Sequence, residues 1–390
     1  MCGIAGMVNL KANIKDRQSN LTAMTDTLKM RGPDSHGVFI SSHALLGHRR
    51  LVVVDPSGGA QPMERTINGK KYVIVYNGEL YNTEDVRKEL LNLGFSFKAY
   101  SDTEVLLTAY IAWKEDCVKH INGIYAFGIW DENSNKLFLC RDPLGVKPLF
   151  YTVTNNTIIF GSEIKTILAS SLVEPVLDEE GLCEIFGLSP AKRLDSGTFK
   201  GIKQLPPACF LIYDQSGLRI KEYWQLVSKP HTEDPESTAE HTRNLLIDAI
   251  KRQLVADVPV CTFLSGGLDS SIISAIASSE FKKDGKILDT YSIEYKDNSL
   301  YFKASEFQPN SDEEWVEKMH QFLGSNHHRI IIDHPELVKS LEAATMGNDV
   351  PAMADIDSSL LLFCKEIRKN ATVALSGECA YSLRYIIVSL

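Results

Sequence analysis

The chain has 390 residues, of which 44% are hydrophobic and 23% charged, a composition typical of globular proteins and not of disordered chains. Its length exceeds that of one typical domain, so we expect two, with three as the alternative. The formal net charge of −9 gives no electrostatic reason to expect nucleic-acid binding, although local groups or a metal could still hold a small anion such as a nucleotide.

The eight cysteines are scattered and form no CxxC pair, so neither a disulfide framework nor a zinc site is expected. No N-terminal stretch joins basic residues to an apolar segment, and no apolar run reaches the roughly 18 residues of a membrane span. These features predict a soluble protein of the reducing cytoplasm that binds neither nucleic acid nor membrane.

The first part of the chain predicts short strands that follow one another as in hairpins. Residues 71–82, KYVIVYNGELYN, read as a strand that runs into a turn at Asn77-Gly78, because both residue types tolerate positive φ. TEDVRKELLNLGF has helical spacing and ends at Gly94. Further strands are expected at residues 122–131, 136–142 and 157–163. This succession predicts antiparallel sheet with packed helices.

A change of composition marks the expected domain boundary. SKPHTEDPEST, residues 228–238, holds two prolines and several charges and predicts a linker. We therefore place one domain at about residues 1–227 and a second at about 236–390.

The second part alternates between strands and helices. Strands are expected at residues 258–264, 287–295, 328–333 and 372–378, with helices at 271–281, 335–346 and 358–369. Such alternation predicts a parallel sheet covered on both faces. Parallel sheets bind ligands at the carboxyl ends of their strands, where SGGLDSS and SGE both lie.

The chain opens with MCGIAG, which raises the question of what Cys2 does. A lone cysteine is more often a small buried apolar residue than a nucleophile. If Met1 is removed, however, Cys2 carries a free α-amine with a pKa of about 7.7 to 8.0 beside its thiol. That amine can act as the local general base, so no separate histidine is needed.

Several polar motifs follow Cys2 in a fixed order: RGPDSHG (31–37), GHRRL (47–51), YNGELYN (76–82), SDTEVLL (101–107) and RDPLGVKPLFY (141–151). Over about the first 210 residues this set resembles the class II glutamine amidotransferases, which are N-terminal-nucleophile glutaminases. The resemblance implies an αββα sandwich of two antiparallel sheets between helix layers. It also implies that Cys2, as the mature N-terminus, attacks the side-chain amide of glutamine.

The resemblance further implies a binding site for glutamine. Arg50 would pair with the α-carboxylate in a bidentate fork, and Asp102 would receive the α-ammonium group with Glu79 nearby. The Asn77 side chain and the Gly78 N–H would form an oxyanion hole. The implied glutamine-binding residues are Arg50, Leu51, Val52, Val53, Val54, Asn77, Gly78, Glu79 and Asp102. Taken singly, Asn77-Gly78 could be only a turn, Asp102 only a helix cap and Arg50 only a surface charge.

FLSGGLDSS, residues 263–271, follows a buried strand and opens a helix. Its two glycines allow close approach of the backbone, and the helix N-terminus offers unpaired N–H groups to a pyrophosphate. No GxxxxGK[ST] loop occurs in the chain. The alternative is an ordinary strand-to-helix turn capped by Asp269 or Ser270.

The longer SGGLDSS resembles the PP-loop of ATP pyrophosphatases. By that resemblance the ATP-binding residues are Leu264, Ser265, Gly266, Gly267, Asp269, Ser270, Ile293, Ser376 and Gly377. Asp269 would also bind Mg²⁺, and Glu378 would lie close to the reacting carboxylate during formation of the intermediate.

A class II glutaminase followed by a PP-loop domain is the layout of the glutamine-hydrolysing asparagine synthetases, and residues 197–214 resemble the segment between their two halves. The implied substrates are L-glutamine, L-aspartate and ATP, with a homodimer kept open as the assembly. ATP would convert aspartate to β-aspartyl-AMP, which ammonia from glutamine attacks to give asparagine, AMP, diphosphate and glutamate.

The end of the chain departs from that family. The family continues well past 390 residues and follows SGE with an acidic pair, whereas SGECA runs here into YSLRYIIVSL, which has no acidic residue. We therefore expect a synthetase truncated at its C-terminus, with a tail of unrelated sequence, weak or absent asparagine synthesis, and glutamine hydrolysis that persists.

Two other functions remain open. One is a PP-loop amidotransferase that acts on another carboxylate, such as a β-lactam-forming or peptide-modifying synthetase. The other is a non-catalytic remnant that binds glutamine or ATP or regulates a partner. Amidotransferases that make amino sugars or phosphoribosylamine are disfavoured, because they lack an ATP pyrophosphatase domain.

Overall fold

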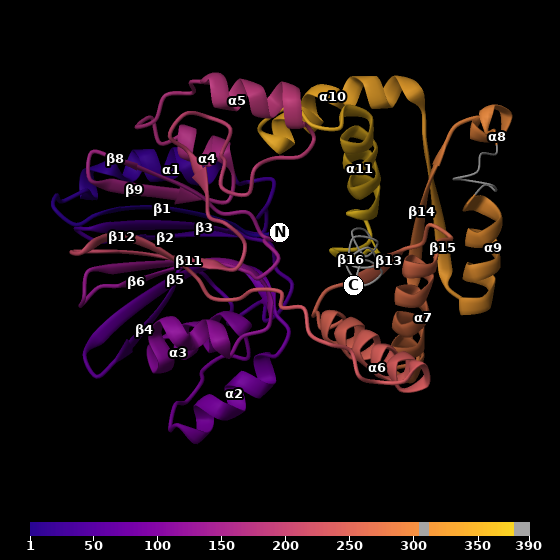
Figure 1. Ribbon diagram of the computed structural model, residues 1–390, viewed down its shortest axis with the longest axis horizontal. Helices are drawn as coiled ribbons and strands as arrows, with labels where there is room; N and C mark the ends of the chain where they lie inside the picture. The colour runs from indigo at the N-terminus through magenta and orange to yellow at the C-terminus, as the bar shows by residue number, and fades with distance from the viewer. Residues whose placement is uncertain (304–311, 378–390) are drawn as a thin grey trace. The chain divides into compact units, whose positions relative to one another are not determined.

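The computed structural model of the chain describes residues 1–303 and 312–377, and contacts within it divide the chain into two units (Figure 1). The first unit comprises residues 1–226 with 349–352, and the second comprises residues 227–348 and those from 353 onward. Glu378 and the tail at 381–390 lie outside the described residues.

The first unit contains two antiparallel sheets, each of six strands among the described residues. In spatial order, the first sheet is β10 (Lys203–Gln204), β8 (Phe150–Thr154), β9 (Thr157–Gly161), β1 (Gly3–Asn9), β3 (Ala44–Arg50) and β2 (Ser35–Ile40). The second is β12 (Gly217–Glu222), β11 (Cys209–Asp214), β7 (Lys136–Arg141), β6 (Gly123–Asp131), β5 (Lys70–Leu80) and β4 (Met63–Ile67).

Side-chain alternation along the strands builds three buried layers. In β1, Ile4 and Val8 point into the core between the sheets, whereas Ala5 and Met7 pack on the opposite face. In β5, Val73 and Val75 enter the same central core while their neighbours pack towards α3. A sheet that is apolar on both faces must be covered on both faces, so each sheet also needs a helix layer.

Helices supply those outer layers. They are α1 (Gln18–Asp26), α2 (Thr83–Asn92), α3 (Asp102–Trp113), α4 (Ile164–Leu168) and α5 (Glu179–Cys183), with short helical turns at Lys15–Arg17, Lys114–Lys119 and Glu184–Leu188. α1 and α4 pack on the first sheet, whereas α3, with α2 beside it, packs on the second (Figure 1). The predicted αββα sandwich is therefore confirmed.

One local prediction is wrong: β5 does not turn at Asn77-Gly78. The strand continues to Leu80, with Asn77 opposite Ala126 and Gly78 opposite Tyr125 of β6. Glycine is required for a different reason, since a Cβ at position 78 would collide with the carbonyl oxygen of Ile124. The glycine permits the close approach of two strands. From the sequence alone, an Asn-Gly pair that serves this purpose cannot be distinguished from one that forms a turn.

The second unit has a parallel sheet of four strands among its described residues. In spatial order they are β15 (Asn326–Ile332), β14 (Asp289–Tyr295), β13 (Val260–Phe263) and β16 (Val373–Leu375). Its helices are α6 (Pro235–Gln253), α7 (Leu268–Lys283), α8 (Asn298–Tyr301), α9 (Asp312–Leu323), α10 (His334–Asn348) and α11 (Ala354–Ile367).

Helices cover both faces of this sheet. Cys261 of β13 packs with α11 residues on one face, while the neighbouring Val260 packs with α6 and α7 residues on the other. The predicted parallel sheet covered on both faces is confirmed. α6 begins inside the predicted linker, because the Asp234 side chain caps it by accepting from the N–H groups of Glu236 and Ser237.

None of the helices in the described ranges is long and apolar enough to cross a membrane.

Candidate functional site

Cys2 lies at the start of β1 against the segment that follows β3. Because Gly3 pairs with Arg49, the chain direction places Cys2 beside Arg50 and Leu51. The Leu51 N–H donates to Cys2 Sγ at 3.4 Å, and the thiol lies 3.5 Å from the Leu51 carbonyl oxygen. Arg31 Nε donates to the Cys2 carbonyl oxygen at 3.0 Å. The Leu51 backbone thus holds the Cys2 thiol, and the Arg31 guanidinium holds the Cys2 carbonyl group.

The surroundings of Cys2 favour the neutral thiol. Burial raises the pKa of Cys2, although the Leu51 N–H and the Arg50 charge partly oppose that rise, while the Glu79 charge adds to it. A thiol with a raised pKa is a poor nucleophile at neutral pH. Its chemistry therefore requires a base within reach.

Arg50 organises the loop that follows β3. Its guanidinium is buried and donates to the carbonyl oxygens of Val54 at 3.1 Å, Asp55 at 2.6 Å and Pro56 at 2.9 Å. The Asp55 carboxylate in turn accepts from the N–H groups of Gly58 at 2.7 Å and Ser101 at 3.0 Å. The loop that contains the predicted glutamine-binding residues Leu51 to Val54 is thereby fixed. Arg50 as the partner of glutamine's carboxylate stays a prediction.

Asn77 and Gly78 each present an N–H hydrogen-bond donor. Asn77 is 1% exposed, and its Nδ2 has no hydrogen-bond partner among the described residues. An unpartnered buried amide costs about 1–3 kcal/mol, so such a group calls for an explanation. An oxyanion that arrives only with substrate would provide the missing acceptor.

The Gly78 N–H lies on an open edge of β5. The β4–β5 pairing ends at Met63↔Ile74, and N–H groups two residues apart point to the same edge of a strand. On that edge the Tyr76 N–H donates to Gln61 Oε1 at 2.6 Å and the Leu80 N–H to Asp102 Oδ2 at 3.2 Å. The Gly78 N–H points the same way between them. The role of this N–H and of Asn77 Nδ2 as an oxyanion hole stays a prediction.

Asp102 and Glu79 are two enclosed carboxyl groups beside these donors. Asp102 is the first residue of α3, whose N-cap is Ser101, and it accepts from the Tyr76 hydroxyl at 2.9 Å. Burial raises the pKa of Asp102, with its hydrogen bonds opposing the rise. Burial and the charge of Asp102 also raise the pKa of Glu79, which Lys147 opposes. A ligand ammonium would relieve this crowding of negative charge.

The second cluster of predicted residues lies where β13 passes into α7. The Leu264 N–H donates to the Tyr291 carbonyl oxygen at 2.8 Å, which joins the ends of β13 and β14. Beyond it, Ser265 and Ser270 place their hydroxyls 3.0 Å apart, and the Ser265 N–H donates to Ser270 Oγ at 3.2 Å. Gly266 has φ +79°, so this loop needs glycine at that position.

A second loop closes on the first. A Cβ at Gly377 would lie 3.1 Å from both Asp269 Cβ and the Ser270 nitrogen, so the Ser376-Gly377 segment rests against the first turn of α7. Apart from Gly266, which lies within the loop itself, the predicted ATP-binding residues all line one cavity of about 590 Å³: Leu264, Ser265, Gly267, Asp269, Ser270, Ile293, Ser376 and Gly377.

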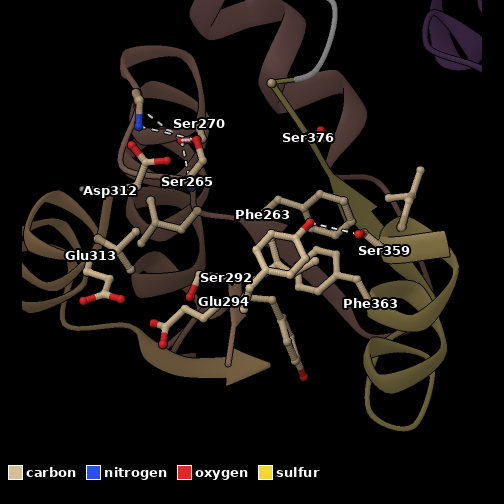
Figure 2. A pocket seen from close by; sticks show the side chains of 18 of the residues that line it. Phe263, Ser265, Ser270, Ser292, Glu294, Asp312, Glu313, Ser359, Phe363 and Ser376 are labelled. Atoms are coloured by element: carbon tan, nitrogen blue, oxygen red, sulfur yellow. Dashed lines mark hydrogen bonds between the residues drawn. The ribbon is translucent and has the colours of Figure 1, made fainter. Parts of the chain in front are cut away.

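The cavity has a polar and an apolar side. Figure 2 shows Ser265 and Ser270 together on one side, and Phe363 with Ser359 of α11 on the other. Four carboxylates also line the cavity: Asp269, Glu294, Asp312 and Glu313. Among the described residues of the cavity wall there is no Lys, Arg or His. An anion bound here would need cations from outside the described wall.

Comparison with known proteins identifies both halves. Residues 1–224 match the family described as "Glutamine amidotransferase domain", and residues 241–383 match "Asparagine synthase". A putative glutamine-hydrolysing asparagine synthetase 2 of Methanocaldococcus jannaschii is 35% identical over 97% of this chain and 74% of its own. The chain belongs to the glutamine-hydrolysing asparagine synthetase family.

Relatives in this family are longer than the chain. Glutamine-hydrolysing asparagine synthetase 3 of Bacillus subtilis is 54% identical over 97% of the chain, which spans 62% of that relative's length. Asparagine synthetase 1 of the same organism is 32% identical, and the chain spans 58% of it. A solved structure described as "the allosteric regulatory enzyme of purine biosynthesis" is 15% identical over 93% of this chain and 91% of that chain, with a TM-score of 0.46, which is too low to support an assignment.

For this member of the asparagine synthetase family, sequence reasoning missed several residues near both sites. Lys147 and Arg31 lie within quoted motifs, yet no role was assigned to either. Glu294 directly follows the predicted Ile293 on β14, so its position at the end of that strand could have indicated that it lines the cavity. Asp312 and Glu313 reach the cavity from the start of α9, and no spacing in the sequence connects that helix to the loop after β13.

Proposed function

We propose that this chain hydrolyses glutamine at Cys2 and uses the ammonia to convert aspartate to asparagine with ATP. The observation that carries the first half is the unpartnered, buried Nδ2 of Asn77 on β5, next to Gly78, whose N–H lies on the open edge of that strand. The Cys2 thiol, held by the Leu51 N–H, supports it as the nucleophile. Support for the second half comes from the cavity that collects the predicted PP-loop residues. The family relationship supports their combination in one chain.

The glutaminase half of the proposal begins with removal of Met1, which converts the Cys2 nitrogen from a peptide N–H to an amine. The amine takes the thiol proton as Sγ forms a bond to the side-chain carbonyl carbon of glutamine. The resulting oxyanion accepts hydrogen bonds from Asn77 Nδ2 and the Gly78 N–H. Collapse of this intermediate expels ammonia, with the amine returning the proton, and leaves a thioester on Sγ. Water then cleaves the thioester and releases glutamate.

Recognition of glutamine uses charge at its other end. We propose that Asp102 and Glu79 accept the α-ammonium group, which supplies the positive charge that these two crowded carboxyls lack. The buried Arg50 guanidinium is proposed to face the α-carboxylate while it also holds the loop after β3 in place. Leu51 to Val54 would then line the substrate through that loop.

The synthetase half uses the loop after β13. The N–H groups of the Ser265–Ser270 loop and the N-terminus of α7 are proposed to hold the β- and γ-phosphates of ATP. Leu264 and Ile293, at neighbouring strand ends, would contact the adenosine. The aspartate side-chain carboxylate attacks the α-phosphorus, pyrophosphate leaves, and ammonia then displaces AMP from β-aspartyl-AMP.

Mg²⁺ fits this cavity. Asp269 lies in its wall within the first turn of α7, and Mg²⁺ binds through one or two carboxylates together with substrate phosphates. Asp269 would hold the ion, which neutralises phosphate charge during adenylation. This is consistent with the shortage of protein cations in the described cavity wall.

We also propose a cytoplasmic location and leave a homodimer as the proposed assembly. Cys2, Cys117, Cys140, Cys183, Cys209, Cys261 and Cys364 are all free thiols in the described residues, which is consistent with a reducing compartment.

The first experiment is a glutamine hydrolysis assay on the purified chain, with intact mass recorded to establish the state of Met1. Cys2→Ala should abolish glutamate release, while Cys183→Ala, which removes an exposed thiol on α5, should leave it unchanged. Equal turnover in Cys2→Ala and the unaltered chain would refute the proposed nucleophile. No turnover in either would favour the non-catalytic alternative.

The second experiment omits glutamine and supplies aspartate, ATP, Mg²⁺ and ammonium. Release of AMP that depends on aspartate is the expected sign of adenylation, and Cys2→Ala should retain it. AMP release that aspartate does not stimulate, but another carboxylate does, would indicate a different acceptor. Asparagine is measured in the same reaction.

A further inference from the structure

Lys147 is held in place by the turn between β7 and β8. The Asp142 carboxylate accepts from the Lys147 N–H at 2.9 Å and from the N–H groups of Leu144 and Val146 at 3.1 and 2.9 Å. The buried Arg141 guanidinium donates to the Lys147 carbonyl oxygen at 2.8 Å. The backbone of Lys147 is therefore fixed from both sides, so its side chain has a defined starting point.

The side chain of Lys147 ends beside the side chain of Met1. The residue is only 8% exposed, and Nζ lies 3.3 Å from Met1 Sδ. Arg31 approaches the same sulfur at 3.8 Å and holds the Cys2 carbonyl oxygen through Nε. Two cations thus border the residue whose removal would expose the Cys2 amine.

Burial of the Lys147 ammonium is energetically costly. Among the residues described, no carboxylate oxygen lies within 4.0 Å of Lys147 Nζ, and a buried ammonium without a carboxylate partner is unfavourable. Burial lowers the pKa of Lys147, with the Glu79 charge opposing this and the Arg31 charge adding to it. An enclosed cation that no carboxylate neutralises at close range is a candidate for a functional charge.

We propose that Lys147 is a positioning residue of the glutaminase site: its ammonium, which contacts the Met1 sulfur, disfavours the protonated form of the Cys2 amine once Met1 is removed. This inference rests on the proposed glutaminase function. An amine that must accept the thiol proton works only when neutral, and a like charge nearby raises the neutral fraction. Lys147 thus acts through the amine and does not touch the reacting carbon.

Other charged groups of this site either act on the amine or are engaged with other partners. Arg31 acts in the same direction as Lys147, although its guanidinium is paired with Glu163 at 3.1 Å. Glu79 acts in the opposite direction when it is ionised, but its raised pKa keeps much of it neutral near pH 7. The Asp142 carboxylate accepts hydrogen bonds from backbone N–H groups, and the Arg50 guanidinium donates to loop carbonyl oxygens.

The test uses protein whose first residue is Cys2, obtained by cleaving a leader and verified by intact mass. Competitive acetylation of the α-amine across pH, read by mass spectrometry, gives the amine pKa without any need for turnover. Lys147→Met should raise that pKa by about one unit, a tenfold change in the neutral fraction below it. Lys147→Arg should restore it, and Lys200→Met, which removes an exposed lysine of the same unit, should have no effect.

Activity provides the second measurement. In Lys147→Met, kcat/KM for glutamine should fall about tenfold at pH 6.5 and return to the unaltered value near pH 9, because only the acid limb moves. A loss of equal size at every pH would show a merely structural role and overturn the proposal. A melting temperature for each variant identifies any that fails to fold, and Lys147→Gln then replaces it.

A third variant separates Lys147 from Glu79. The shift in the amine pKa on Lys147→Met should persist in a Glu79→Gln background; if it vanishes there, Lys147 acts only through Glu79 and the proposal is overturned. An unchanged amine pKa in Lys147→Met overturns it as well. No glutamine turnover in unaltered protein with Cys2 first would instead refute the proposed function, while the acetylation result still decides the effect of Lys147.

Discussion

The two candidate sites are built in different ways. In the first unit, the predicted glutamine-site side chains come from several segments, and most of their polar atoms are already bonded: Arg50 to three loop carbonyls, Asp102 to Tyr76 and Leu80. In the second unit, one loop and the ends of adjacent strands surround a cavity of about 590 Å³ with four carboxylates in its wall.

The difference corresponds to two kinds of chemistry. A covalent nucleophile needs its base and oxyanion donors fixed before substrate arrives, since such preorganised groups need no rearrangement during reaction. A nucleotide brings much of its own structure, with phosphates that bind backbone N–H groups and a metal that supplies positive charge. The first site should therefore respond sharply to loss of single polar groups, and the second chiefly to changes of loop backbone.

Apart from loss of the nucleophile itself, the largest effect is expected from Asn77→Ala. Loss of the buried amide donor should lower kcat for glutamine hydrolysis about 100- to 1,000-fold, because it bonds to the oxyanion and not to bound glutamine. ATP affinity should not change. Asn92→Ala, at an exposed position near the end of α2, is the control. Unaltered kcat in Asn77→Ala would remove the oxyanion role, and an equal rise in KM would indicate a binding role instead.

Gly266→Ala tests the second site. With φ +79° at this position, a Cβ would lie 2.9 Å from Trp315 Cβ and 3.0 Å from the Asp312 carbonyl oxygen. The left-handed conformation costs a non-glycine residue about 1–2 kcal/mol, so we expect about a tenfold loss of ATP affinity by calorimetry. Gly285→Ala imposes the same kind of strain at φ +68° in open space and should leave ATP binding intact. Equal effects of both would mean that strain alone is responsible.

A smaller effect is expected from pH on glutamine binding, measured with Cys2→Ala so that no hydrolysis occurs. Burial raises the pKa of both Asp102 and Glu79, so each carboxyl holds its proton to higher pH than usual. An ammonium group binds the ionised form, and affinity should therefore rise several-fold between about pH 6 and 8.5. Glu79→Gln should flatten this rise. Affinity that falls over the same range would contradict the proposed role of these carboxyls.

The smallest effect is expected from Tyr295→Phe in the second unit. The Tyr295 hydroxyl donates to Ser359 Oγ at 2.9 Å and joins the end of β14 to α11. Tyr295 is 38% exposed, so the bond should contribute at most about 1 kcal/mol. Hydrogen exchange of α11 amides should show an opening free energy lower by that amount. A loss several times larger would show that this wall is as tightly interlocked as the glutaminase site.

Much of the architecture could be predicted because it depends on local patterns. A run of β-branched and aromatic residues, as around Val73 and Val75 of β5, predicts a strand, and continuous apolar runs such as residues 258–264 predict a buried parallel strand. The cavity loop was predictable for the same reason, since Gly266 and Ser270 belong to one short segment.

Features that depend on how the chain folds back on itself were not predictable. Gly78 reads as a turn residue, but the carbonyl oxygen of Ile124 on the neighbouring strand is what requires a glycine there. The hydrogen bonds that Arg50 donates to the carbonyl oxygens of Val54 and Pro56 depend on how the loop after β3 folds back. Lys147 stands 145 residues from Cys2, so only the fold brings its ammonium to the N-terminus.

The most direct test of the central claim uses a glutamine analogue whose side-chain amide is replaced by a diazoketone. Incubated with protein whose first residue is Cys2, it should form one covalent adduct per chain, and peptide mass spectrometry should locate that adduct on Cys2. Excess glutamine should protect against the reaction, and Cys2→Ala should form no adduct. An adduct on another residue, or no adduct in protein shown by intact mass to begin with Cys2, would contradict the assignment of Cys2 as the nucleophile.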